Sequence, residues 1–139
     1  MHVLFIGGSG LLGSQLVSVL RNQDGDGTMF PRVFVDAPTS KELDITKPII
    51  FTYEDMQKYD LIVLAAAYTD VSNAEVKRRE CFATNVEGTI NLLKTYHDKP
   101  IVFISTEYAH NPVNYYSETK LAAETAVKAN NNLKLKIKN

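Results

Sequence analysis

A glycine-rich turn close to the N-terminus constrains the fold more than any other feature of the sequence. A short apolar run at residues 3–6 leads directly into Gly7-Gly8-Ser9-Gly10-Leu11-Leu12-Gly13, and apolar residues with helical spacing follow at once. Glycines between a buried strand and a helix let the backbone turn tightly and approach a ligand, and the start of the helix offers free N–H groups and a partial positive charge. This context predicts a binding site for the pyrophosphate of a dinucleotide. The residues expected to form it are Gly7, Ser9, Gly10, Leu11, Leu12 and Gly13.

The alternative is a turn that only links a strand to a helix. No Lys-Ser or Lys-Thr pair follows the glycines, which disfavours a P-loop nucleotidase.

Apolar runs typical of buried strands recur along the chain, separated by segments of helix length. Strands are expected at residues 3–6, 33–35, 42–45, 61–66, 101–104 and 133–137. Helices are expected from residue 11 to the polar segment 22–27, at 52–58, around the stripe of Val86, Ile90 and Leu93, and at 116–129. Such alternation predicts an α/β fold with right-handed βαβ crossovers. We expect a single Rossmann-type domain over residues 1–139, with a doubly wound parallel sheet of about six strands in the order 3-2-1-4-5-6 and helices on both faces.

The composition argues against several classes of protein. The formal net charge is −1, so nothing indicates a nucleic acid or an anionic membrane as a partner. No apolar run is long enough to span a bilayer, and the N-terminal run lacks the basic segment and cleavage site of a signal peptide. The single cysteine, Cys81, excludes an internal disulfide, and His97 and His110 lack the spacing of metal ligands. We therefore expect a cytoplasmic protein without a metal site.

Two charged residues near the end of the second expected strand bear on the choice of dinucleotide. Asp36 closes that strand, where a carboxylate accepts hydrogen bonds from the adenosine ribose hydroxyls of NAD. Lys41 lies shortly beyond it and would pair with the 2′-phosphate of NADP. Asp36 also has an alternative role as a turn residue ahead of Pro38. Both NAD and NADP therefore remain candidate cofactors.

Tyr116 and Lys120 lie four residues apart in an expected helix, which places them on one face. A free tyrosine has a pKa of ~10, and a neighbouring ammonium lowers that pKa, which would make Tyr116 a proton donor to a ketone oxygen. Pairs with this spacing are also common on protein surfaces. This pair gains weight because Ser105-Thr106 follows the fifth expected strand, and open α/β sheets bind ligands at the carboxyl ends of their strands.

Five segments in a fixed order carry a family resemblance. They are Leu43-Asp44-Ile45-Thr46, Ala65-Ala66-Ala67-Tyr68-Thr69, Asn85-Val86-Glu87-Gly88-Thr89, Ile104-Ser105-Thr106-Glu107-Tyr108 and Tyr116-Ser117-Glu118-Thr119-Lys120-Leu121-Ala122-Ala123-Glu124. In this order they resemble segments of the dTDP-4-dehydrorhamnose reductases, a family of the extended short-chain dehydrogenase/reductase superfamily. The resemblance covers the chain from Met1 to about Glu124, with Glu107 standing where the family has aspartate.

The resemblance implies an NAD(P)-dependent oxidoreductase that reduces the 4-keto group of a nucleotide sugar, as in dTDP-rhamnose biosynthesis. Tyr116 would protonate the substrate carbonyl as hydride arrives from the nicotinamide. Lys120 would hold the nicotinamide ribose and lower the pKa of Tyr116. Thr106, helped by Ser105, would hydrogen-bond the carbonyl oxygen where negative charge develops.

The resemblance also implies further contacts with the cofactor. Asp44 and Ile45 would meet the adenine edge, and Asn85 would lie in the helix that faces the active site. The groove would be lined by Ala65, Ala66 and Ala67. The alternatives are that Asp44 caps a turn, that the alanines only pack tightly, and that Asn85 is a hydrogen-bonded core residue that bends its helix.

Two departures from the family bear on activity. The segment from residue 107 to 116 is shorter than the family's, and the chain stops at Asn139, where relatives continue into a domain that grips the nucleotide sugar. A naturally short protein and a truncated gene both fit this length. A non-catalytic dinucleotide-binding or regulatory module, and a sugar-nucleotide epimerase or dehydratase, are therefore kept as alternatives. A homodimer or a partner chain would complete the substrate pocket.

Overall fold

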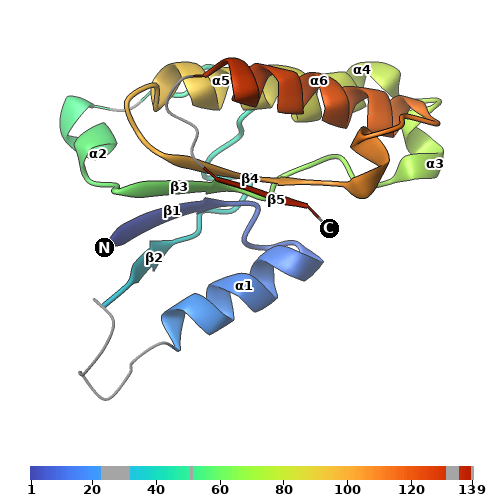
Figure 1. Cartoon of the computed structure of the whole chain (residues 1–139). Coiled ribbons are helices and arrows are strands. Elements are labelled where there is room, and N and C mark those ends of the chain that lie inside the picture. The colour runs from blue at the N-terminus through green and yellow to red at the C-terminus, as the bar shows by residue number, and fades with distance from the viewer. Residues whose placement is uncertain (23–31, 51, 131–134, 139) are drawn as a thin grey trace.

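The computed structural model describes residues 1–22, 32–50, 52–130 and 135–138, and it contains a parallel sheet between two layers of helices (Figure 1). Among the described residues, five strands form the sheet in the order β2-β1-β3-β4-β5. All four pairings are parallel. The strands are β1 (His2–Ile6), β2 (Phe34–Asp36), β3 (Leu61–Leu64), β4 (Ile101–Ser105) and β5 (Leu135–Lys138). Apart from one missing edge strand, this is the predicted order, and the doubly wound fold is confirmed.

Helices cover both faces of the sheet, as predicted (Figure 1). On one face lies α1 (Leu11–Arg21), and on the other lie α5 (Gly88–Thr95) and α6 (Tyr115–Ala129). The shorter helices are α2 (Tyr53–Gln57), α3 (Val71–Ala74), α4 (Arg78–Phe82), the π-helical η1 (Ala83–Glu87) and the 3₁₀-helical η2 (Glu107–Ala109). No helix in the described part of the chain combines the length and apolarity needed to cross a bilayer.

The core forms two apolar layers because successive side chains of a strand point to opposite faces of the sheet. Leu4 and Ile62 belong to the layer that α5 and α6 cover. Val3 and Val63, their neighbours in sequence, belong to the layer under α1. Burial on both faces explains why the central strands are continuous apolar runs rather than alternating ones.

The edge strand predicted at residues 42–45 is wrong, because this segment folds as consecutive turns. The Glu42 carboxylate accepts hydrogen bonds from the backbone N–H and the hydroxyl of Thr39, at 2.7 and 2.9 Å. The Asp44 carboxylate accepts the same pair of bonds from Thr46, at 3.0 and 2.6 Å. Side chains that bond the nearby backbone in this way offer it an alternative to a sheet ladder. The described sheet therefore has five strands rather than six.

The long helical segment predicted after the fourth strand is present, but it is not uniform. It passes from α4 through the π-helical η1 into α5. The Thr89 hydroxyl donates to the carbonyl oxygen of Asn85 at 2.7 Å. Gly88 packs so closely on Ile45 that a Cβ there would lie 2.7 Å from Cγ1 of Ile45. The absence of a side chain at Gly88 lets the turn segment that replaces the edge strand pack against this helix.

The ends of three predicted elements need comment. The predicted strand 61–66 ends early, because the N–H groups of Ala65 and Ala66 both donate to the carbonyl oxygen of Ile6, at 2.8 and 3.0 Å. The predicted end of the first helix, at 23–27, lies outside the described residues. The start of the last predicted strand, at 133–134, also lies outside them.

Candidate functional site

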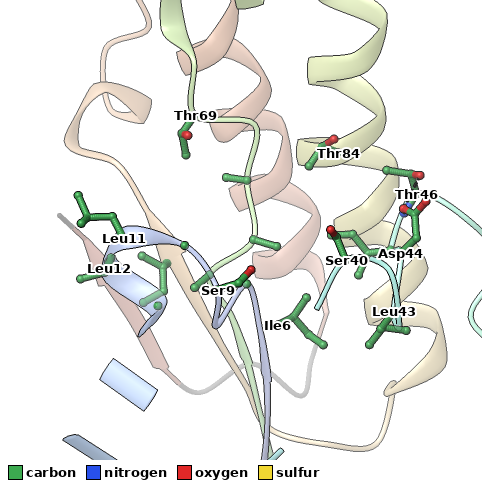
Figure 2. Close-up of a pocket in the computed structure, with 18 of the residues that line it drawn as sticks. Ile6, Ser9, Leu11, Leu12, Ser40, Leu43, Asp44, Thr46, Thr69 and Thr84 are labelled. Atoms are coloured by element: carbon green, nitrogen blue, oxygen red, sulfur yellow. Dashed lines mark hydrogen bonds between the residues drawn. The ribbon is translucent and has the colours of Figure 1, made fainter. Parts of the chain in front are cut away.

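A cavity of about 580 Å³ lies at the carboxyl ends of β1, β3 and β4. Its walls come from the glycine turn, the loops after β2 and β3, η1, the end of β4 and α6. Figure 2 shows Leu11 and Leu12 at one side of the cavity and Asp44 and Thr46 at the other, with Ser9 between them. This is the edge at which open α/β sheets bind their ligands, and the volume is in the range of small-molecule sites.

Most of the predicted site residues line this cavity. They are Gly7, Ser9, Gly10, Leu11, Leu12, Gly13, Asp44, Ile45, Ala65, Ala66, Ala67, Tyr116 and Lys120. The predicted residues that do not line it are Asp36, Lys41, Asn85 and Thr106. The fold therefore gathers the glycine turn and the Tyr116–Lys120 pair, which lie at opposite ends of the chain, around one space.

Two glycines of the turn are required by close packing. Gly7 has a φ of 91°, and a Cβ there would lie 2.4 Å from the backbone nitrogen of Ala66. A Cβ on Gly13 would lie 2.1 Å from the carbonyl oxygen of Gly7. Gly10 differs, because the nearest atom to a Cβ there would be 3.4 Å away. Gly7 and Gly13 serve the fold of the turn, whereas Gly10 leaves room on the side of the cavity.

The start of α1 lies at the cavity and has no side-chain cap. Its N-cap residue is Gly10, and its first turn contains no acidic residue. The first N–H groups of a helix have no partner within the helix. Together with the helix dipole they attract an anion. The start of α1 therefore fits a phosphate group.

Lys120 is buried where α6 meets β4. Its Nζ donates to the carbonyl oxygen of Ile104 at 2.8 Å and lies 4.4 Å from the centre of the Phe103 ring. Burial lowers the pKa of Lys120 to about 8, and the Glu124 carboxylate one turn further along α6 opposes this shift. The cavity wall thus contains an ammonium group that loses its proton more easily than an ordinary lysine does.

Tyr116 lines the cavity one helical turn before Lys120 and is half-buried. Burial raises the pKa of its phenol, and Cys81 acts in the same direction. The predicted lowering of this pKa by Lys120 is therefore wrong for this structure, in which the ammonium bonds to the Ile104 carbonyl instead. A phenol in this environment is protonated at neutral pH, which suits a proton donor.

Ser105 lines the cavity, and Thr106 does not. Ser105 is the last residue of β4 and is buried, and its hydroxyl donates to the Glu124 carboxylate at 2.5 Å. Thr106 is the N-cap of η2, where its hydroxyl accepts the N–H of Tyr108 at 3.4 Å. The carbonyl-binding role of Thr106 stays a prediction.

Asp36 is held outside the cavity by two residues that follow α2. The Lys58 ammonium and the Tyr59 hydroxyl donate to the same oxygen of Asp36, at 2.5 and 2.9 Å. The Lys58 ammonium holds the pKa of Asp36 below its usual range, and burial raises the pKa of Tyr59. Because Lys41 also lies off the cavity wall, these two positions leave the choice between NAD and NADP open.

Asn85 is buried, and its side chain forms hydrogen bonds within the protein. Its amide oxygen accepts the N–H of Tyr68 at 2.7 Å, and its amide nitrogen donates to the hydroxyl of Thr119 at 2.9 Å. A longer contact of 3.5 Å reaches the sulfur of Cys81. These bonds join the loop after β3 to η1 and α6. The alternative of a hydrogen-bonded core residue describes Asn85 better than the predicted contact with the cofactor.

Asp44 has the turn role that was its alternative, and its contact with the adenine stays a prediction. The Thr46 hydroxyl lowers the pKa of Asp44, and Lys47 pairs with its carboxylate at 3.2 Å. It is therefore a turn residue that also lines the cavity. Elsewhere in the described residues, no three His, Cys, Asp or Glu side chains are grouped as metal ligands.

Several wall residues were not assigned to the site from the sequence. They are Ile6, Pro38, Ser40, Leu43, Thr46, Thr69, Thr84 and Ile104. Pro38 and Thr69 lie in loops that directly follow strands, and the rule that ligands bind at strand ends identifies such positions. Thr84 lies in η1, and no local sequence signal marks its turn toward the cavity.

The family model of the RmlD substrate binding domain matches residues 1–137. The chain belongs to this family. The sequence of this RmlD-type chain is similar to those of curated dTDP-4-dehydrorhamnose reductases. The protein from Aggregatibacter actinomycetemcomitans is 34% identical over 110 residues, which is 77% of this chain and 35% of that protein. The one from Mycolicibacterium smegmatis is 32% identical over 136 residues, which is 76% of this chain and 40% of that protein.

Another relative of the RmlD-type chain has a different activity. A UDP-N-acetylglucosamine 4,6-dehydratase (inverting) from Campylobacter jejuni is 37% identical over 81 residues, covering 56% of this chain and 24% of that protein. The chain thus spans between about a quarter and two fifths of these three relatives.

Solved structures share the fold of the RmlD-type chain. A dTDP-4-dehydrorhamnose reductase from Clostridium acetobutylicum matches 97% of this chain and 52% of its own, with a TM-score of 0.82 and 26% identity. The reductase from Bacillus anthracis, solved in complex with NADP, matches 99% of this chain and 53% of its own, with a TM-score of 0.76 and 24% identity. The described chain therefore corresponds to about half of each of these proteins.

Proposed function

We propose that this chain binds NAD or NADP in the cavity and forms the cofactor-binding half of a reductase for the 4-keto group of a nucleotide-activated sugar. The observation that carries the proposal is one space lined by the glycine turn, the uncapped start of α1, Tyr116 and Lys120. Relatives named dTDP-4-dehydrorhamnose reductase support the reaction class. The similarly folded reductase in complex with NADP supports the class of cofactor.

The residues of the cavity fit a nicotinamide dinucleotide. The open position at Gly10 and the start of α1 would hold the pyrophosphate. Asp44 and Ile45 would line the adenine, and Tyr116 and Lys120 would hold the nicotinamide ribose. When bound, the cofactor supplies the hydride of the reaction.

Tyr116 would supply the proton of the reaction. Because burial raises its pKa, its phenol is protonated at neutral pH and donates to the alkoxide that develops on the substrate. The Lys120 ammonium on the next helical turn, which bonds to the Ile104 carbonyl, would hold the nicotinamide ribose. The burial of both side chains strengthens these interactions because water screens them less. The resemblance adds Thr106, whose hydroxyl would have to leave its bond to the N–H of Tyr108.

Binding and turnover are tested separately. Titration with NADH and with NADPH, followed by nicotinamide fluorescence, is expected to show saturable binding. Oxidation of the bound form by a dTDP-4-keto-6-deoxyhexose is expected to fall by roughly 10²- to 10⁴-fold in Tyr116→Phe, whereas cofactor affinity is expected to fall only by roughly 3- to 10-fold, the value of one net hydrogen bond. Tyr108→Phe, at an exposed position, is the control. Equal background rates in wild type and Tyr116→Phe would contradict catalysis by this residue.

A second candidate is a non-catalytic dinucleotide-binding or regulatory module. It is favoured by Thr106, whose hydroxyl caps η2 and does not line the cavity. It predicts cofactor binding without turnover and co-purification with a partner protein. The similarity to a 4,6-dehydratase supports a further alternative, in which the protein is a sugar-nucleotide dehydratase or epimerase. Analysis of the sugar product by NMR distinguishes these reactions from reduction.

We also propose that the protein acts in the cytoplasm as a short-chain dehydrogenase/reductase, and that a homodimer or a partner chain completes the substrate pocket. Three exposed apolar side chains support an association surface. They are Val76 just before α4, Phe82 in α4 and Leu121 in α6, with exposed fractions of 84%, 37% and 38%. Light scattering of the purified chain tests the oligomeric state. A monomer that turns over a nucleotide sugar would contradict the need for a second chain.

A further inference from the structure

Glu124 is a buried acidic residue with no role in the function proposed above. Only 3% of its surface is exposed, although it lies on α6 one turn after Lys120. One carboxylate oxygen accepts the Ser105 hydroxyl at 2.5 Å. The other lies 3.6 Å from the ammonium of Lys128, whose side chain is 62% exposed. A carboxylate taken out of water is costly unless its hydrogen bonds are made, so this residue needs a structural or functional reason.

The bond to Glu124 determines how Ser105 meets the cavity. A serine hydroxyl has one proton to donate and two lone pairs that accept. In Ser105 that proton is given to Glu124, and a hydrogen bond to a charged acceptor is stronger than one between neutral groups. Ser105 lines the cavity, so what it offers a ligand is an oxygen that accepts. It is poorly suited to donate to a carbonyl oxygen, the helping role that the sequence suggested for it.

The neighbouring polar group in the same wall has the opposite character. The Lys120 ammonium has only donors, and one of them is used on the Ile104 carbonyl. Ile104 and Ser105 are consecutive residues of β4, and Lys120 and Glu124 are one turn apart on α6. Two hydrogen bonds between the same strand and helix therefore set a donor and an acceptor side by side in the cavity wall.

We propose that Glu124 is a positioning residue that fixes Ser105 as a hydrogen-bond acceptor, so that the end of β4 selects a ligand group that donates a hydrogen bond. This inference rests on the proposed function, under which the ligand is a nicotinamide dinucleotide. The donor at the reacting end of such a ligand is the N–H of its carboxamide group. The carbonyl of the sugar substrate is then left to Tyr116 and Thr106.

The test compares two ligands that differ only in this donor. NADP carries a carboxamide, and its 3-acetylpyridine analogue carries a methyl ketone in the same place. Wild-type protein is expected to bind the analogue roughly 3- to 10-fold more weakly, the value of one net hydrogen bond. Ser105→Ala is expected to bind the two ligands about equally. Glu124→Gln is expected to narrow the difference, because a neutral amide oxygen accepts the hydroxyl proton more weakly than a carboxylate does. Thr125→Ala, at the exposed neighbouring position, is the control and is expected to keep the wild-type ratio.

A second measurement follows the hydroxyl proton itself. Hydrogen-bonded and buried, the Ser105 proton is expected to give a slowly exchanging proton NMR signal that is absent in Ser105→Ala and exchanges faster in Glu124→Gln. An unchanged ligand ratio in Ser105→Ala, or no such signal in wild type, overturns the proposal. Failure of wild type to bind either dinucleotide contradicts the proposed function instead, and the NMR measurement then still decides the role of Glu124. If Glu124→Gln does not fold, Ser105→Ala decides both measurements.

Discussion

The carboxylate of Asp36 accepts a hydrogen bond from the hydroxyl of Tyr59 at 2.9 Å, from a residue 23 positions further along the chain. Tyr59 is buried in the layer under α5, where its ring meets Tyr96 edge-on at 6.4 Å. A ring that the core holds in place fixes its hydroxyl as well, so Asp36 is anchored on the side of α2. The acidic residue that would bind the ribose of NAD is thereby kept away from the cavity wall.

Tyr59→Phe is expected to shift the preference toward NADH. Without the hydroxyl, the Asp36 carboxylate is held only by the exposed Lys58, and it can turn more easily to accept ribose hydroxyls and to repel a 2′-phosphate. The ratio of the NADPH and NADH dissociation constants is expected to rise roughly 3- to 10-fold, measured by nicotinamide fluorescence. Tyr53→Phe, an exposed tyrosine in α2, is the control. An unchanged ratio in Tyr59→Phe would show that Asp36 does not contribute to the choice of cofactor.

Gly13→Ala and Gly10→Ala are expected to separate the fold of the turn from its binding role. An alanine at Gly13 places Cβ 2.1 Å from the Gly7 carbonyl oxygen, so the turn must shift, at an expected cost of about 1–3 kcal/mol in the free energy of unfolding. At Gly10 the nearest atom is 3.4 Å away, so we expect a loss of at most ~1 kcal/mol but clearly weaker dinucleotide binding. Urea unfolding and cofactor titration of both variants check this. If Gly10→Ala binds the dinucleotide with wild-type affinity, the pyrophosphate does not bind at the start of α1.

The stability of the protein is expected to depend on pH through Lys120. Its folded pKa of about 8 lies below the ordinary 10.5, so the unfolded chain binds more protons between these values. The cost of burying the charge is therefore fully present below pH 8 and is relieved as the pH rises toward 10.5. This cost of burying the Lys120 charge is expected to be on the order of 1–3 kcal/mol.

The measurement is urea unfolding of wild type and Lys120→Met at pH 7 and pH 10. As the pH rises, the free energy of unfolding of wild type is expected to increase relative to that of Lys120→Met. Lys94→Met, at an exposed position in α5, controls for the loss of a positive charge. If the difference in the free energy of unfolding between wild type and Lys120→Met is the same at both pH values, the lowered pKa of Lys120 is contradicted.

Asn85→Ala is expected to lower stability much more than cofactor affinity. The substitution leaves the N–H of Tyr68 without the acceptor it has at 2.7 Å and removes the donor to Thr119, at an expected cost of about 2–4 kcal/mol. Because Asn85 does not line the cavity, the folded variant is expected to bind NADPH nearly as wild type does. Thermal unfolding and fluorescence titration measure the two effects, with the exposed Asn73→Ala as control. A large loss of affinity in a stable variant would restore the contact predicted from the sequence.

The strand order and the position of the glycine turn follow from the sequence alone. Apolar runs, helical periodicity and glycines are local properties, and right-handed crossovers convert their order along the chain into an order in the sheet. The predicted strand at residues 42–45 fails for a reason that is also local. There, the carboxylates of Glu42 and Asp44 accept hydrogen bonds from nearby backbone N–H groups, and these bonds compete with pairing to a neighbouring strand.

Which polar side chains reach the cavity depends on tertiary packing. Ser105 and Thr106 are adjacent in sequence, yet the first lines the cavity and the second caps η2. Asp36 is held by Tyr59 and Asn85 is bonded to Thr119, 34 residues away. Hydrogen bonds between residues so distant along the chain leave no periodic pattern in the sequence, because they depend on where packing places two elements. Local sequence patterns are therefore enough to predict the order of the five strands and the glycine turn, whereas packing selects the groups that can meet a ligand.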